Sequence, residues 1–377
     1  MKIEEIYEDN IIINKFKIMV AAAGTGGHIY PGLAISEYFL EQSIPVSWAG
    51  TPKGMENSLV DKCKIPFYSI RISGIRGKGI LPWIKLPFML FRSVLQSITA
   101  LRVEKPDFVI IMGGYIGIPV AIASKLLGIH IIIHEQNAIP GLANKVISKI
   151  ANQIYCGFEN SLKKSIVVGN PIRKKIADIQ NPRQRFKNKV GPLKILILGG
   201  SLGANAFNRL LPEILNELSF QNKIEVIHQS GEKHYEELVE IYKNLESGIS
   251  TKNPSWLIST EKYIHNIEEK YGWADIVIAR SGALTVSEFI EAGVASILIP
   301  FPYAVDNHQY YNGKILENKK AAYIVNENEI ANKLLKVLLK INRKECLSMA
   351  LKAQKNKLCS NVAYKIFTYC EEINNEK

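Results

Sequence analysis

The stretch FKIMVAAAGTGGH, residues 16–28, places a run of apolar residues directly before a glycine-rich loop and a histidine. Apolar runs of this length are typical of buried strands, and residues 33–40 have the spacing of an amphipathic helix. The same order returns in LKILILGGSLG, residues 193–203, ahead of helix-like residues 206–218. The two copies lie 177 residues apart, close to half of the 377-residue chain. We therefore predict two similar α/β domains in tandem.

Further apolar runs of strand length occur in both halves of the chain. They cover residues 108–112, 130–134, 166–168, 224–228, 276–279 and 296–300. Helix-length segments separate most of these runs, and such alternation is typical of parallel sheets covered by helices on both faces. The predicted fold class is therefore α/β, with two Rossmann-like, doubly wound parallel sheets.

The boundary between the domains is predicted at residues 169–171, Gly-Asn-Pro, which lead into a basic stretch without apolar periodicity. We expect an N-terminal domain over residues 15–170 and a C-terminal domain over residues 171–349. A C-terminal helix within residues 350–377 is expected to pack back on the first domain. A chain of 377 residues is long enough for two such domains, each with its own core.

The net charge of +12 is concentrated in two places. Residues 62–105 and residues 163–189 each hold nine basic residues and one acidic residue, so each stretch carries +8. A local excess of this kind predicts an anionic partner, which can be nucleic acid, anionic lipid or a phosphorylated ligand. The composition, 47% hydrophobic and 22% charged, excludes a disordered or fibrous chain.

Neither cysteine usage nor hydropathy points to a secreted or membrane-spanning protein. The five cysteines form no CxxC pair, which argues against a disulfide framework or zinc site and fits a reducing cytoplasm. Residues 1–10 carry four acidic residues, the opposite of the basic start of a signal peptide. The uncharged run at 108–124 is interrupted by glycine and proline and is shorter than the ~20 apolar residues of a membrane span. Any membrane contact is therefore expected at the surface.

Three glycine loops follow predicted strands and open helices, where backbone N–H groups can bind a phosphate. Two of them are quoted above, and each taken alone is as well explained by a tight turn, since full GxGxxG and P-loop spacings are missing. The third, RSGA at residues 280–283, has small residues that permit a diphosphate to approach. Glu288, one turn further, can accept hydrogen bonds from two neighbouring ribose hydroxyls. The alternative is a capped helix with a solvated Glu288.

Two polar groups follow strand ends at the edge where open α/β sheets bind ligands. His28 is flanked by glycines, which leave little bulk to bury it, so it is a candidate general base as well as a candidate structural residue. The second group is HEQN, residues 134–137, and is expected to face the same cleft. The six aspartates lie far apart and form no DxD motif, so no metal ion or other cofactor is predicted.

Taken in order, these motifs resemble those of the MurG family, N-acetylglucosaminyltransferases of glycosyltransferase family 28 in bacterial peptidoglycan synthesis. The matching segments run from about residue 17 to residue 325 and include RISGIRGKG at 71–79, GGY at 113–115 and GNPIR at 169–173. The resemblance implies a GT-B fold, with two Rossmann-like domains around a cleft. It implies that the C-terminal domain binds UDP-N-acetylglucosamine and that the N-terminal domain receives lipid I.

The resemblance also assigns residues to the site. It implies catalytic roles for His28, as general base, and for Glu135 and Asn137. It implies binding of the donor by Thr25, Gly26, Gly27, Asn137, Arg173, Ser201, Ile264, Ala283, Leu284, Thr285, Val286, Ser287, Glu288 and Gln309. Leu202 departs from the pattern, because the family usually has glutamine there, and the spacing around Gln309 varies within the family.

The activity implied is an inverting transfer of N-acetylglucosamine from the UDP-sugar to the C4 hydroxyl of the N-acetylmuramic acid of lipid I. The products would be lipid II and UDP. A single displacement needs one base and stabilisation of the leaving diphosphate. Helix dipoles can stabilise the diphosphate without a metal ion. The partners implied are both substrates and an anionic membrane, with no nucleic acid, and contacts with other proteins of cell-wall synthesis or division stay open.

In the basic stretch 62–105, cations alternate with large apolar residues, a mixture suited to an anionic membrane surface. The predicted membrane patch contains Ile75, Lys78, Leu81, Trp83, Lys85 and Phe88. It would hold the protein peripherally on the cytoplasmic face of the bacterial inner membrane. The alternative is a loop and helix packed on the core with solvated lysines.

Three other functions compete with this prediction. An oxidoreductase on tandem Rossmann domains would need a carboxylate at the end of the second strand, where residues 46–50 read VSWAG. Another GT-B glycolipid transferase, such as a diacylglycerol glucosyltransferase, shares the glycine loops, but GNPIR and HEQN favour the peptidoglycan enzyme. A non-catalytic membrane-binding module is disfavoured because nearly every donor-binding position is retained.

Overall fold

The computed structural model describes residues 16–74, 81–200, 203–247, 256–355 and 361–376, without the side chains of residues 81–83 and 85. Contacts within the chain divide it into two units. The first unit contains the chain up to His134, Leu142–Tyr155 and the chain from Asn361 onward. The second unit contains Glu135–Gly141 and Cys156–Ser360.

A seven-stranded sheet has the order β3-β2-β1-β4-β5-β6-β7. The pairs β2·β3, β1·β2, β1·β4 and β4·β5 are parallel, and Ile18 lies opposite Val46 on one side and Phe108 on the other. The central strands are buried along their length, as the uninterrupted apolar runs predict. The strands are β1 (Ile18–Ala21), β2 (Val46–Gly50), β3 (Phe67–Ser69), β4 (Phe108–Ile111), β5 (His130–Glu135), β6 (Gln153–Cys156) and β7 (Ile166–Val167).

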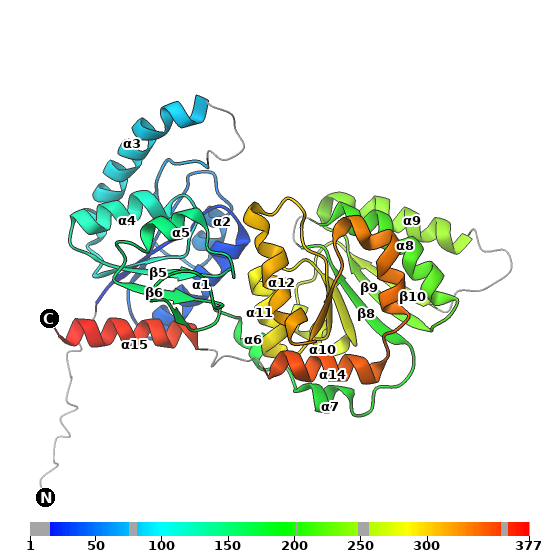
Figure 1. Cartoon of the computed structure of the whole chain (residues 1–377). Helices are drawn as coiled ribbons and strands as arrows, with labels where there is room; N and C mark the ends of the chain where they lie inside the picture. Colours follow the sequence, from blue (N-terminus) through cyan, green and yellow to red (C-terminus); the bar gives the residue numbers. More distant parts are fainter. Residues whose placement is uncertain (1–15, 75–80, 201–202, 248–255, 356–360, 377) are drawn as a thin grey trace, which may run out of the picture. The chain divides into compact units, whose positions relative to one another are not determined.

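Helices of the first unit lie on both sides of its strands. Helices α3, α4 and α5 pack together on one side, and α1 and α15 pack together on the other (Figure 1). The helices are α1 (Gly26–Glu41), α2 (Glu56–Lys62), α3 (Leu81–Glu104), α4 (Gly117–Leu126), α5 (Leu142–Ile147) and α15 (Val362–Asn375).

The C-terminal helix α15 is anchored on the first unit by aromatic contacts. The ring of Phe367 lies 5.6 Å from that of Phe39, 6.0 Å from that of Tyr38 and 6.1 Å from that of Phe16, centroid to centroid. Aromatic pairs at these separations contribute to the stability of the fold in addition to the contribution from the apolar area that they bury. Phe16 and helix α15 therefore share one apolar cluster, although they are more than 300 residues apart in sequence.

The second unit is built on a six-stranded parallel sheet of order β10-β9-β8-β11-β12-β13. Alternate residues of its strands enter two different cores: Ile195 and Ile197 pack with helix α8, whereas Leu196 and Leu198 pack with helix α11. The strands are β8 (Leu193–Leu198), β9 (Ile224–Gln229), β10 (Trp256–Glu261), β11 (Ile276–Ala279), β12 (Ser296–Leu298) and β13 (Ala322–Ile324).

The helices of this unit complete a doubly wound arrangement. They are α6 (Lys174–Ala177), α7 (Pro182–Phe186), α8 (Asn205–Ser219), α9 (Tyr235–Ser247), α10 (Ile267–Trp273), α11 (Ala283–Ala292), α12 (His308–Asn318), α13 (Leu335–Leu338) and α14 (Arg343–Gln354). Short 3₁₀ turns occur at Glu232–His234, Val305–Asn307 and Glu327–Glu329, and a π-helical turn at Ile330–Leu334. The predicted fold class, two parallel α/β sheets covered by helices, is confirmed.

Candidate active site

In the first unit, the glycine loop after β1 opens helix α1. Thr25 occupies the N-cap position without a side-chain cap, and the helix begins at Gly26. The carbonyl of Thr25 accepts hydrogen bonds from the N–H groups of His28 and Ile29 at 3.0 and 3.3 Å. The loop therefore starts a sixteen-residue helix whose dipole favours a negatively charged group at this end.

His28 lies in the first turn of α1, half-buried against the glycines that follow β4. A Cβ atom at Gly113 would lie 2.9 Å from Cε1 of His28, and one at Gly114 would lie 2.8 Å from the carbonyl oxygen of Ala23. Both glycines have positive φ, +105° and +80°. Only glycine leaves room here for the imidazole, so the structure brings together two of the motifs that sequence analysis singled out.

Described residues line a cavity of about 410 Å³ in the second unit and one of about 620 Å³ in the first. The cavity of the first unit includes Gly24 of the glycine loop and Tyr115 of the GGY motif. It carries two cations, Lys53 and Arg71, and hydroxyls from Thr51, Ser73 and Tyr115. This lining suits a polar, negatively charged group.

Glu135, the last residue of β5, is buried and holds the loop that follows it. Its Oε1 atom accepts hydrogen bonds from the backbone N–H of Asn137 at 2.9 Å and from the Asn137 side chain at 3.2 Å. Its Oε2 atom accepts from the N–H of Gly141 at 3.0 Å. A buried carboxylate is stabilised by such donors. The geometry therefore supports a positioning role for Glu135, and a direct catalytic role stays a prediction.

Asn137 is connected to the loop before α11 through a residue that sequence analysis missed. Asn312, fully buried in α12, donates through Nδ2 to Asn137 Oδ1 at 3.1 Å and to the carbonyl of Ser281 at 3.3 Å. Its Oδ1 accepts from the N–H of Ala138 at 2.9 Å. The one sequence signal was its place one turn after Gln309. Asn312 fixes the orientation of the Asn137 amide.

Helix α11 begins immediately after β11 and a loop of small residues. Gly282 is the N-cap and supplies no side-chain cap, and its carbonyl accepts from the N–H of Val286 at 3.0 Å. The first-turn N–H groups of Ala283, Leu284 and Thr285 have no intrahelical partner, as at any helix start. The run predicted to bind the sugar nucleotide, residues 283–288, is thus a helix N-terminus with small residues before it.

Glu288 and Arg173, both predicted to bind the donor, are in contact. Arg173 Nη2 lies 3.0 Å from Glu288 Oε1, and the hydroxyl of Tyr271 donates to Glu288 Oε2 at 2.9 Å. Only 14% of the Glu288 side chain is exposed, against 55% for Arg173. Burial lowers the pKa of Arg173, but the negative charge of Glu288 outweighs it, so the pKa is raised overall. Tyr271, buried in α10, was not found from the sequence.

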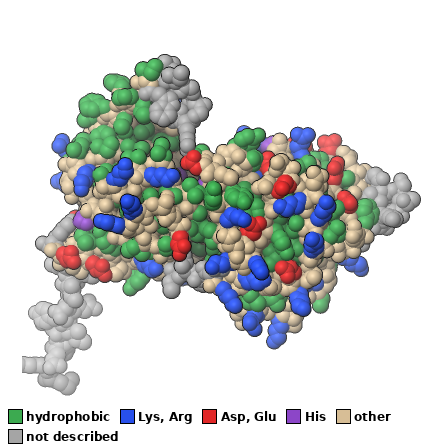
Figure 2. All heavy atoms as spheres, in the orientation of Figure 1, with side chains coloured by type: hydrophobic (Ala, Val, Ile, Leu, Met, Phe, Trp, Pro, Cys, Tyr) green, Lys and Arg blue, Asp and Glu red, His purple; other side chains and the backbone are tan. Residues whose placement is uncertain are grey.

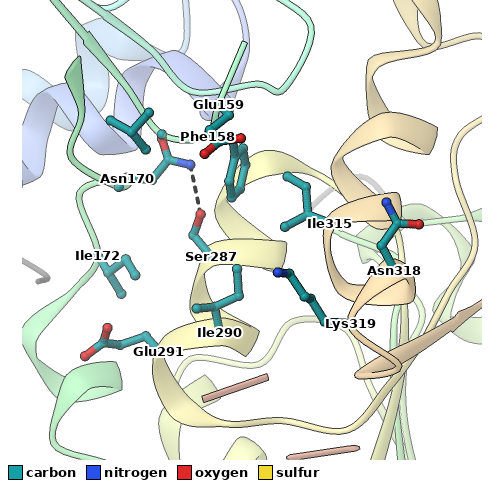
Figure 3. A pocket seen from close by; sticks show the side chains of 13 residues that line it. Phe158, Glu159, Asn170, Ile172, Ser287, Ile290, Glu291, Ile315, Asn318 and Lys319 are labelled. Atoms are coloured by element: carbon teal, nitrogen blue, oxygen red, sulfur yellow. Dashed lines mark hydrogen bonds between the residues drawn. The ribbon is translucent and has the colours of Figure 1, made fainter. Parts of the chain in front are cut away.

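Ser287, in the same run, has a structural partner. Its Oγ accepts from Asn170 Nδ2 at 2.8 Å, and Asn170 also donates to the carbonyl of Gln136 at 3.1 Å. Figure 3 shows this hydrogen bond at the side of a cavity that also exposes the apolar side chains of Ile290 and Ile315. The hydroxyl of Ser287 therefore ties α11 to the Gly-Asn-Pro segment, and donor binding by it stays a prediction.

Ile264 and Gln309, both predicted to bind the sugar nucleotide, each take part in a hydrogen bond between a backbone N–H and a glutamine side chain. The N–H of Ile264 donates to Gln229 Oε1 at 3.4 Å, and Gln229 Nε2 donates to the carbonyl of Gly200 at 2.9 Å. Gln309 Oε1 accepts from the N–H of Phe301 at 2.9 Å. Ser201 and Leu202 lie outside the described residues. Gln229, the last residue of β9, was missed although it stands at a strand end.

Two cations of the basic stretch 163–189 have partners inside the second unit. Within 163–189, Arg185 donates to the carbonyls of Tyr271 and Ala292 at 3.3 and 2.9 Å and to that of Gly293. Lys189 donates to the carbonyls of residues 273 and 274, each at 2.8 Å, and pairs with Asp275 at 3.1 Å. Burial lowers the pKa of Arg185 to about 10 and also lowers that of Lys189. These cations stabilise the unit itself, so they need no external anion.

Helix α3 carries an exposed apolar face. Ile84, Phe88, Phe91 and Leu95 are 70%, 73%, 63% and 49% exposed, and their spacing of four, three and four residues places them on one side of the helix. Figure 2 shows apolar side chains gathered over α3. Of the predicted membrane patch, Ile75, Lys78 and the side chains of Leu81, Trp83 and Lys85 lie outside the described residues.

Within the described ranges, no three His, Cys, Asp or Glu side chains cluster in a way that could hold a metal ion. In that same part of the chain, no helix is long and apolar enough to cross a membrane. Cys156, Cys346 and Cys370 are buried free thiols, and burial raises the pKa of Cys346 to about 12.

Comparison with known proteins bears on both units. Residues 18–156 match the glycosyltransferase family 28 N-terminal domain, and residues 194–365 match its C-terminal domain. The chain is 40% identical over 361 residues, covering 95% of it and 99% of the relative, to a UDP-N-acetylglucosamine–N-acetylmuramyl-(pentapeptide) pyrophosphoryl-undecaprenol N-acetylglucosamine transferase of Haemophilus influenzae. The chain belongs to the MurG family.

Other members of the MurG family are similar to this chain over comparable lengths. A transferase of the same description from Nitrosospira multiformis is 40% identical over 341 residues, covering 89% of this chain and 93% of the relative. The crystal structure of Acinetobacter baumannii MurG is similar at a TM-score of 0.81 and 34% identity, over 94% of this chain and 99% of that one. Similarity at this level shows the GT-B architecture of the family as well as the sequence relationship.

Proposed function

We propose that this protein transfers N-acetylglucosamine from UDP-N-acetylglucosamine to the C4 hydroxyl of the N-acetylmuramic acid of lipid I, undecaprenyl-pyrophosphoryl-MurNAc-pentapeptide. The products are lipid II and UDP, and the anomeric configuration is inverted. The observation that carries the proposal is the 40% identity to a transferase of this description over 95% of the chain. The enzyme class follows from the same relationship: it is an N-acetylglucosaminyltransferase of glycosyltransferase family 28.

The second unit is the proposed donor site. The uncapped N-terminus of α11 offers N–H groups to the diphosphate, and the small residues 281–283 let it approach. Glu288 accepts from the ribose hydroxyls, and the backbone of Ile264 meets the uracil. Asn137, whose amide orientation Asn312 fixes, and Gln309 bind the sugar. This division assigns the donor to the C-terminal domain and the acceptor to the N-terminal domain.

His28 is the proposed general base. The acceptor C4 hydroxyl gives its proton to the imidazole while its oxygen attacks C1 of N-acetylglucosamine. The C1–oxygen bond to the diphosphate breaks, and UDP leaves with the bonding electron pair. N–H groups at the α11 N-terminus stabilise the charge on the leaving diphosphate. No covalent enzyme intermediate is formed in this single displacement.

The apolar face of α3 is the proposed membrane contact. Three large apolar side chains more than 60% exposed on one side of a helix, with Arg92 exposed among them, match an anionic bilayer surface. The protein would then act as a peripheral enzyme where its lipid-linked acceptor resides. The polar cavity beside Gly24, with Lys53 and Arg71, supports binding of a negatively charged acceptor in the same unit.

The test is transfer of label from radiolabelled UDP-N-acetylglucosamine. The protein is incubated with a lipid I analogue, with diacylglycerol, or with neither, each with and without EDTA. We expect labelled glycolipid only with the lipid I analogue and equal rates with EDTA. Labelling of diacylglycerol instead would favour the other GT-B glycolipid transferases, and no labelled lipid in any arm would overturn the proposal.

A further inference from the structure

The carboxylate of Glu288 is held by one flexible and one fixed partner. Arg173, which approaches Oε1, is 55% exposed at its side chain. Tyr271, which donates to Oε2 at 2.9 Å, is 2% exposed, and its ring packs edge-on against Phe289 with centroids 5.4 Å apart. Tyrosine has two side-chain torsions and this one is enclosed by core, so its hydroxyl is a fixed point in the unit.

The hydroxyl of Tyr271 is protonated at neutral pH and donates a hydrogen bond to Glu288. Burial, followed by the negative charge of Glu288, raises its pKa well above the ordinary value of 10. Each carboxylate oxygen accepts two hydrogen bonds, so one bond from the phenol leaves Oε2 with capacity for one more. Because the position of the Tyr271 hydroxyl is fixed, the direction from which Glu288 Oε2 can accept its second hydrogen bond is fixed as well.

We infer that Tyr271 is a positioning residue that aims the Glu288 carboxylate and thereby sets the preference for ribonucleotide over 2′-deoxyribonucleotide donors. This inference rests on the proposed function of Glu288 in accepting from the ribose. Two neighbouring hydroxyls match the two oxygens of one carboxylate only when its plane is held in one orientation. Arg173 cannot hold it alone, since an exposed arginine keeps much of its rotamer freedom.

The experiment measures binding of UDP and of 2′-deoxy-UDP to the full chain by calorimetry. The parent protein is expected to bind UDP about tenfold or more tightly than 2′-deoxy-UDP, as for loss of a hydrogen bond to a charged group. In Tyr271→Phe, which keeps the ring and its packing, this ratio is expected to fall to about threefold or less, because Glu288 is no longer aimed.

Tyr242→Phe is the matched control. Tyr242 is another buried phenol of the second unit with one side-chain partner, His228 Nδ1 at 2.9 Å, and it lies outside the proposed site. The control is expected to keep the parental ratio, and similar melting temperatures of the two variants show that both fold. Incorporation of 4-aminophenylalanine at position 271 restores an N–H donor and is expected to restore most of the ratio.

A second pair of variants shows through which residue Tyr271 acts. In a Glu288→Ala background the ratio is expected to be low, and adding Tyr271→Phe changes it no further. A parental ratio in Tyr271→Phe, or a parent protein that binds UDP and 2′-deoxy-UDP equally, would overturn the inference while leaving the transferase proposal standing. Absence of any UDP binding by the parent protein would overturn both.

Discussion

At the scale of single residues, His28 lies half-buried beside two glycines that cannot be enlarged without disturbing their surroundings. The ring lies against Gly113 and Gly114, which both have positive φ. A methyl group at Gly113 would have to displace the imidazole, since the Cβ atom would stand 2.9 Å from Cε1 and 3.0 Å from Nδ1. The two glycines of the GGY motif therefore leave the space that the side chain of the proposed base, His28, occupies.

The first prediction concerns His28 and the glycine beside it. His28→Ala is expected to lower kcat by about 10²-fold or more, the usual contribution of a general base. Gly113→Ala is expected to lower kcat as well, by moving the ring. Steady-state kinetics over a range of pH measures both.

Gly128→Ala is the control for Gly113→Ala. Gly128 also has positive φ, +72°, in the first unit, but nothing lies within 4 Å of a Cβ at that position. It is expected to cost some stability and leave kcat unchanged. Near-parental kcat and pH dependence in His28→Ala would move the proton acceptor elsewhere, with residues 134–137 as the first candidates.

The identity of the individual site residues could be proposed from their types, but their contacts could not. Glu288 was singled out because a carboxylate one turn into a helix can face a ribose. Its partners, Tyr271 and Arg173, come from segments 17 and 115 residues away. Sequence shows no distances between such segments, so Tyr271, Gln229 and Asn312 carried no signal strong enough to find them.

At the scale of elements, the stretch 173–189 is where sequence patterns were least informative. It contains α6 and α7, of four and five residues, too short for periodicity to show. Two of its cations, Arg185 and Lys189, donate to backbone carbonyls of neighbouring elements. Similarly β10, a half-exposed edge strand with the sequence WLISTE, lacked the continuous apolar run by which the central strands were predicted.

The second prediction tests the internal role of this stretch. Asp275 is fully buried at its side chain, pairs with Lys189 and accepts from Arg343 Nε at 3.1 Å and from the N–H of Lys194 at 3.0 Å. Asp275→Ala leaves the buried ammonium of Lys189 unpaired and is expected to lower the free energy of unfolding by about 3–5 kcal/mol. Urea denaturation measures it.

A surface ion pair provides the comparison. Lys314 and Glu317, on α12, are in contact and partly exposed. Glu317→Gln is expected to leave the denaturation midpoint close to that of the parent protein, since exposed pairs contribute little. If the denaturation midpoint of Asp275→Ala were as close to that of the parent protein as the midpoint of Glu317→Gln, the structural role of Lys189 and its partner would be contradicted.

The third prediction belongs to helix α3. Replacing Ile84, Phe88 and Phe91 with serine removes most of the exposed apolar face and is expected to abolish flotation with vesicles containing anionic lipid. Val103→Ser is the control, because Val103 is 66% exposed on the same helix but lies off this face. Undiminished flotation of the triple variant would show that α3 is not the membrane contact.

At the scale of the whole molecule, repetition of the strand–glycine loop–helix pattern was enough to predict two parallel α/β sheets. That prediction is confirmed, because a buried parallel strand is apolar throughout and therefore visible in one sequence. The C-terminal helix α15, which the sequence analysis expected on the first domain, packs on the first unit through Phe367 after the chain has passed through the second.

The structure of the transfer product tests the central claim most directly. The protein is incubated with ¹³C-labelled UDP-N-acetylglucosamine and a soluble lipid I analogue, and the product is examined by NMR while UDP release is followed. We expect one UDP to be released for each β-linked N-acetylglucosamine on C4 of the muramoyl residue. An α linkage, attachment at another position, or UDP release without a glycosylated acceptor would contradict it.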